Sequence, residues 1–181
     1  MLSNIILFIY YPSIYSSPAI KENTKVTNDV FFVGRAKDRL AELHNAYKCL
    51  NSKGFRCDFY ITGVAKEDCA YPEDIHYNTH LTYSETLAHV MKSKGILEIV
   101  QKGANAFTFR LDEALIYDKN IITNNAIIDD LPKEWGEKIF RYDMLNEIHK
   151  DNYDRAYLKT YGYDERYSSH AFLEYLDDLF G

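Results

Sequence analysis

Arg110 and Glu113 lie three residues apart in a segment where Phe107, Leu111, Ala114 and Leu115 recur at helical spacing. Residues three and four apart share one stripe of a helix, so the guanidinium and the carboxylate should face outward on the same side. Such a pair could hold an anion and the vicinal hydroxyls of a ribose. The alternative is a surface ion pair, which contributes little to stability.

The segments around this helix place it in a βαβ unit. Residues 96–100 form an apolar, β-branched run typical of a strand buried on both faces, and the polar loop 101–103 ends it. A helix starts near Phe107, and a second apolar strand follows at 121–122. The loop would bring the helix N-terminus to the carboxyl edge of a sheet, where free N–H groups favour an anion such as phosphate.

A second strand, loop and helix lie earlier in the chain. Residues 30–33 are apolar and end at Gly34, and a helix with apolar residues at positions 40, 43, 47 and 50 ends at Gly54. Between them, Arg35, Lys37 and Arg39 crowd positive charge into the first turn, where cations oppose the helix dipole. The placement indicates either a bound phosphate or a solvated basic turn.

The remaining apolar runs complete an α/β pattern. Strands are expected at 57–61, 75–77 and 138–142, a capped helix begins at Thr82 and ends at Gly95, and a last amphipathic helix follows Ser168 or Ser169. Tyr83, at the mouth of the capped helix, could stack on a base or pack in the core. The order predicts a Rossmann-like open, mostly parallel sheet with helices on both faces, which binds ligands at the carboxyl ends of its strands. Glycines at that edge are Gly34, Gly63 and Gly103.

Composition limits the other functions. The 181 residues are 46% hydrophobic, enough for one domain, and we divide them into an N-terminal strand and connector at 1–28 and a domain at 29–181. A net charge of −6 disfavours nucleic acid as a partner. Three cysteines without a CxxC motif indicate reduced thiols in a cytoplasmic protein, and scattered histidines predict no metal. Residues 2–11 are too short for a transmembrane segment and lack the basic flank of a signal peptide.

Several of these segments together resemble the C-terminal, donor-binding half of GT-B glycosyltransferases, and most of all those of bacterial lipopolysaccharide and capsular polysaccharide biosynthesis. The central likeness is an R-x-x-E-A-L helix at 110–115 followed by a K-x-I-I-T-N-N strand at 119–125. Supporting segments are 29–39, 58–63, 83–85, 96–99, 101–103 and 108–110. The resemblance covers roughly residues 28–181.

The resemblance implies a role for each matching position. Glu113 corresponds to the glutamate that holds the ribose of a nucleoside diphosphate sugar, and the loop from Gly103 to Thr108, preceded by Gln101, corresponds to the backbone that meets the diphosphate. Asn105 stands where many retaining members have a sugar-binding glutamate, so the stereochemical outcome stays open. Further positions implied near the phosphates are Arg35, Lys37 and Arg110, and those implied near the base are Thr62, Gly63 and Tyr83.

GT-B enzymes carry the acceptor on an N-terminal domain of similar size, which the 28 residues before the first strand cannot build. We therefore expect a donor-binding domain that needs a separate acceptor-domain chain, or a second copy, to act as an enzyme. It would work in the cytoplasm, at the inner face of the cell membrane, with the nucleotide sugar as substrate and no further cofactor. The alternative is a non-catalytic Rossmann-like module that binds a nucleotide or a protein partner. A flavodoxin-like regulatory domain is disfavoured because Gly34-Arg35 offers no carboxylate pair.

Overall fold

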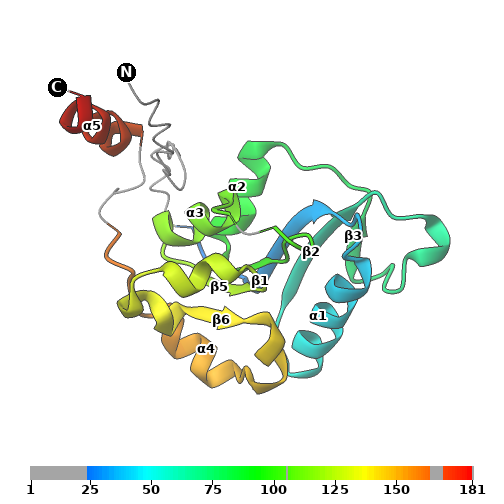
Figure 1. Ribbon diagram of the computed structural model, residues 1–181. Helices are drawn as coiled ribbons and strands as arrows, with labels where there is room; N and C mark the ends of the chain where they lie inside the picture. The colour runs from blue at the N-terminus through cyan, green and yellow to red at the C-terminus, as the bar shows by residue number, and fades with distance from the viewer. Residues whose placement is uncertain (1–23, 105, 164–168, 181) are drawn as a thin grey trace.

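The computed structural model describes residues 24–104, 106–163 and 169–180. Its centre is a six-stranded sheet in the order β3-β2-β1-β4-β5-β6, in which every neighbouring pair is parallel (Figure 1). The strands are β1 (Asn28–Arg35), β2 (Cys57–Thr62), β3 (Ile75–Tyr77), β4 (Ser93–Glu98), β5 (Asn120–Thr123) and β6 (Ile139–Arg141). The predicted Rossmann-like α/β class is confirmed.

The helices cover both faces of this sheet. On one face α2 (Tyr83–Met91) and α3 (Phe109–Ile116) pack against β1, β4 and β5, and on the other lie α1 (Leu40–Ser52) and α4 (Lys150–Tyr157) (Figure 1). Each face has its own apolar core. The core between the sheet and helices α2 and α3 includes Phe31, Ile96 and Leu111. A last helix, α5 (Ser169–Phe180), follows where a final amphipathic helix was expected.

Short 3-10 helices fill the connections that lack an α-helix. They are η1 (Lys66–Asp68) between β2 and β3, η2 (Ala126–Asp130) and η3 (Lys133–Lys138) between β5 and β6, and η4 (Tyr142–Glu147) after β6. Because strand order reverses between β1 and β4, the topological switch point lies there, with the loops after these two strands on either side of it.

Several boundaries differ from the sequence-based expectation. The capped helix α2 ends at Met91, and Gly95 lies inside β4 instead of ending the helix. A Cβ on Gly95 would stand 1.9 Å from the Tyr153 hydroxyl and 2.7 Å from the Asn120 carbonyl oxygen, so glycine is needed there for close packing. Helix α3 begins at Phe109, two residues later than expected. Of the N-terminal strand and connector expected at 1–28, residues 1–23 lie outside the described residues.

Candidate functional site at the carboxyl edge of the sheet

The three glycines expected at the carboxyl edge lie there. Gly34 is the second-to-last residue of β1, opposite Ile61; Gly63 directly follows β2, and Gly103 lies in the loop after β4. Gly63 and Gly103 have φ values of +73° and +82°, a left-handed conformation that favours glycine. A Cβ on Gly103 would meet no heavy atom of the described residues within 4 Å, so the space above this loop is open.

Arg35 lies across the backbone of Gly63. A Cβ on that glycine would be 3.0 Å from Arg35 Nε. Because Gly63 has no side chain, the Arg35 side chain can lie there, at the edge of the sheet. Thr62 donates a weak hydrogen bond of 3.5 Å from its hydroxyl to the Gly34 carbonyl. The fold therefore brings four predicted residues into one group: Gly34 and Arg35 at the end of β1, Thr62 at the end of β2 and Gly63 directly after it.

Side chains also join the two loops at the switch point. Lys37, whose backbone is left-handed at φ 48°, donates from Nζ to Gln101 Oε1 at 2.7 Å. Gln101 Nε2 in turn donates to Asp38 Oδ1 at 3.3 Å. Arg39 donates from Nη1 to the Ile99 carbonyl and from Nη2 to the Arg35 carbonyl. The predicted residues Lys37 and Gln101 are thus direct neighbours, although 64 positions apart.

Thr108 caps helix α3. Its hydroxyl accepts from the Leu111 N–H at 3.2 Å and donates to the Glu98 carboxylate, so it satisfies one free amide of the helix start. Thr108 was expected to meet a diphosphate. In the structure its hydroxyl is occupied by protein partners, and any ligand contact at this residue would fall to its backbone.

Glu113 is fully buried, contrary to the expectation that it faces outward beside Arg110. The two form an ion pair, with the Arg110 side chain 26% exposed and the Glu113 side chain 1% exposed. Only one carboxylate oxygen takes part: Oε1 is buried and has no hydrogen-bond partner within the described part of the chain. Burial raises the pKa of Glu113 even though Arg110 opposes the shift.

Tyr83 belongs to the same group. It lies in the first turn of α2 and is 51% exposed, so it is not the core residue that was the alternative interpretation. Burial of part of the side chain and the nearby charge of Glu113 raise its pKa to about 12, while Arg110 acts in the opposite direction. The Tyr83 hydroxyl is therefore close enough to Arg110 and Glu113 to be affected by their charges.

Sequence reasoning missed the network that positions the loop after β4. Glu98, 3% exposed at the end of β4, accepts hydrogen bonds from the hydroxyls of Thr108 and Thr123. Asn124 binds the Val100 N–H at 2.7 Å, and Asn125 donates to the Ala106 carbonyl at 2.8 Å. Burial raises the pKa of Glu98, against the effect of these donors. The signal in the sequence was Thr123-Asn124-Asn125, three polar residues in a row whose side chains can form hydrogen bonds to the backbone of a turn.

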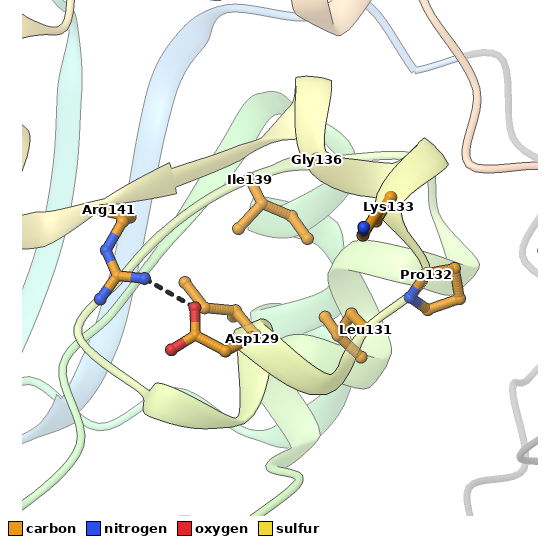
Figure 2. Close-up of a pocket in the computed structure, with 8 residues that line it drawn as sticks. Asp129, Leu131, Pro132, Lys133, Gly136, Ile139 and Arg141 are labelled. Carbon is orange, nitrogen blue, oxygen red and sulfur yellow. Dashed lines mark hydrogen bonds and ion pairs between the residues drawn. The ribbon is translucent and has the colours of Figure 1, made fainter.

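A separate hollow lies beside the edge strand β6. Its volume is about 320 Å³, and Figure 2 shows Ile139, Leu131 and Pro132 around it, with an Asp129–Arg141 ion pair of 2.8 Å on one side and Lys133 on the other. None of the eleven predicted site residues within the described ranges lines this hollow. The candidate site is therefore defined by converging loops and not by this pocket.

No group of three or more His, Cys, Asp or Glu side chains in residues 24–104, 106–163 and 169–180 is arranged to hold a metal ion. Within the same ranges, every helix is too short or too polar to cross a membrane. Asn105, a predicted site residue, lies outside them.

Comparison with known proteins shows the fold. No protein-family model and no curated protein matches this sequence. Among solved structures, the chain is similar to AviGT4, a glycosyltransferase involved in avilamycin A biosynthesis, with a TM-score of 0.54 and 14% identity over 87% of this chain. A weaker similarity, with a TM-score of 0.48 and 14% identity, relates 76% of the chain to 41% of the T4 phage β-glucosyltransferase solved with UDP-glucose. The fold is thus one that glycosyltransferases adopt, and the chain spans 53% of the length of AviGT4.

Proposed function

We propose that this chain is the donor-binding domain of a GT-B glycosyltransferase and binds a nucleoside diphosphate sugar at the carboxyl edge of its sheet. The fold similarity to AviGT4 supports the class of protein. The observation that carries the proposal is Glu113 Oε1, a buried carboxylate oxygen without a donor among the described residues, beside Arg110 at the start of α3. Such an atom is costly to leave unsatisfied, and the hydroxyls of a ribose would supply donors.

The surrounding groups fit the other parts of the ligand. Tyr83, half exposed beside Arg110 and Glu113, offers an aromatic face to a base. The open loop at Gly103 and the cations of Arg35 and Lys37 would face the diphosphate. In glycosyl transfer, negative charge develops on the departing diphosphate, and donors fixed in advance around it lower the barrier. This chain would contribute that stabilisation.

Binding of the acceptor would need a part of the enzyme other than this domain. Because the chain spans about half the length of AviGT4, we propose that a further domain, a separate chain or a second copy binds the acceptor and supplies the general base. The described chain alone should bind donor without transferring sugar. From the motif resemblance alone, the finer proposal is a cytoplasmic role in bacterial surface polysaccharide synthesis, at the inner face of the cell membrane.

Thermal unfolding with nucleotide sugars tests the proposal. UDP-glucose and GDP-mannose are added in turn, and at least one should raise the melting temperature because a ligand that binds only the folded state stabilises it. Glu113→Ala, and Glu113→Gln at nearly unchanged volume, should remove that rise. Glu134→Ala, at an exposed glutamate of η3, should keep it.

The opposite outcome has a clear meaning. If no nucleotide changes the melting temperature of the wild type, the chain is a partner-binding module and not a donor domain. If a nucleotide binds and both Glu113 variants respond as the wild type does, the ribose contact is wrong although the donor class stands.

A further inference from the structure

Lys37 and Arg39, the two cations of the loop after β1, have different roles in the structure. Arg39 is partly buried and donates to three backbone carbonyls, those of Ile99, Arg35 and Ala36, so its guanidinium is used to hold the loops together. Lys37 is exposed, and the acceptor of its ammonium is the side-chain amide of Gln101. Only Lys37 can therefore change its acceptor without breaking a backbone contact between loops.

The Gln101 amide is fixed at both ends. Its oxygen accepts from the ammonium of Lys37, and its nitrogen donates to the carboxylate of Asp38. A flipped amide would point N–H groups at the ammonium and its oxygen at the carboxylate, so the orientation follows from the charges of the two neighbours. The amide oxygen thus stands beside a lysine ammonium at the switch point, in the position that an anion oxygen would take.

A neutral amide is a weaker acceptor for an ammonium than an anionic oxygen, because only the anion adds a full Coulomb attraction to the hydrogen bond. The space over Gly103, two residues after Gln101, is open to the described residues, so an anion can approach from that side. Lys37 is also held in a left-handed backbone conformation at φ 48°, which sets the direction of its side chain before any ligand arrives.

We propose that Gln101 is a surrogate ligand, which holds the Lys37 ammonium at the switch point until a diphosphate oxygen replaces the amide. This inference rests on the proposed function for the identity of the ligand, and it adds a positioning residue that sets the affinity for the diphosphate. Gln101 itself contributes no charge to the bound state. Its role is to keep Lys37 ordered and available.

Calorimetric titration with UDP and with inorganic pyrophosphate tests this exchange. Gln101→Glu places a carboxylate beside Lys37 that competes with the ligand, and we expect the affinity for both ligands to fall about tenfold, equivalent to about 1.4 kcal/mol. Lys102→Gln changes the net charge by the same amount in the next residue, and no hydrogen bond or ion pair joins Lys102 to the described residues. This control should lower the affinity by less than about threefold.

A double variant isolates the contact. On a Lys37→Met background the effect of Gln101→Glu should shrink to that of Lys102→Gln, because the competing ion pair is gone. Equal effects of Gln101→Glu and Lys102→Gln on the Lys37 background would overturn the surrogate role and indicate general charge repulsion. Absence of pyrophosphate binding to the wild type would overturn it as well.

The two ligands separate this inference from the proposed function. If pyrophosphate binds and responds to Gln101→Glu while no nucleotide binds, the exchange at Lys37 stands and the donor assignment fails. If UDP binds and Glu113→Gln weakens it while Gln101→Glu behaves like the control, the donor assignment stands and the exchange fails.

Discussion

The two edges of the sheet treat their charges in opposite ways. At the amino edge, Asp29 is fully buried at the start of β1 and pairs with Lys94 at 3.0 Å, Arg56 at 3.3 Å and also Lys150. At the carboxyl edge, Glu113 is just as buried but has one cation, Arg110, and an oxygen without a partner in the described chain. The buried carboxylate at the amino edge is therefore fully paired, and the one at the carboxyl edge is paired through only one of its oxygens.

Lysines show the same contrast. Lys138, before β6 at the amino edge, is 2% exposed and donates to the carbonyls of Ala156, Tyr157 and Lys159 at 3.4, 3.4 and 2.7 Å. Lys37, at the carboxyl edge, is exposed and bound by one neutral amide. Saturated charges join strands and helices and stabilise the fold, whereas incompletely paired ones leave capacity for a ligand.

The largest effect is expected from removing the buried charge at the amino edge. Asp29→Asn leaves three cations around a neutral amide, and removing one partner of a buried ion pair destabilises by about 3–5 kcal/mol. Urea unfolding measures this loss. Asp154→Asn, which removes the 40% exposed second partner of Lys94, should cost less than about 1 kcal/mol. Equal costs for the two variants would show that the Asp29 cluster is not the main ion-pair contribution to stability.

The next effect concerns packing. Gly95→Ala forces a methyl group against the Tyr153 hydroxyl and the Asn120 carbonyl, and overpacking of this kind costs about 1–3 kcal/mol. Gly34→Ala, at the carboxyl end of β1, meets the tip of the Phe32 ring at 3.1 Å, a contact that a shift of a few tenths of an ångström relieves. We expect this control to cost less than about 1 kcal/mol, in the range of small surface changes. Chemical unfolding of both variants decides whether the amino half of the sheet is the more tightly packed.

The fold was largely predictable because apolar runs and glycines mark parallel strands directly. The capping box at Thr82 and Glu85 is present as expected, with the Thr82 N–H donating to the Glu85 carboxylate at 2.7 Å. Helix α4 was missed because its sequence, Lys150–Tyr157, is polar and buries only Tyr153 and Ala156. Tyr153, Ala156 and Tyr157 are the hydrophobic residues among these eight, and three give too little periodicity to distinguish a helix from a loop.

The site was predictable in its location and less so in its detail. Helical spacing correctly placed Arg110 and Glu113 on one stripe, but spacing cannot tell which way the stripe faces. Helices α2 and α3 pack on the same face of the sheet, and the fold buries Glu113 completely, which the sequence pattern does not show. Likewise, Glu98 was part of an apolar strand in sequence, and its role depends on Thr108 and Thr123, which only the folded chain brings together.

The smallest effect, and the sharpest comparison of the two edges, is the dependence of stability on pH. The sign of this pH dependence should differ between the amino edge and the carboxyl edge. The cations around Asp29 hold its pKa well below the usual value, against the effect of burial, so its contribution is present at neutral pH and is lost in acid below the unfolded pKa of about 3.9. Burial raises the pKa values of Glu98 and Glu113, so the folded state binds protons at higher pH than the unfolded state, and stability should rise as pH falls from 7 toward about 4.5.

Free energies of unfolding between pH 7 and pH 3 measure both contributions. Glu113→Gln should reduce the rise between pH 7 and about 4.5, and Asp29→Asn should reduce the fall below about pH 4. Differences between each variant and the wild type remove the contributions of the other carboxylates. If Glu113→Gln follows the wild-type slope above pH 4.5, then Glu113 is not strained by burial, and the unpaired oxygen that we assign to a ribose is already satisfied within the protein.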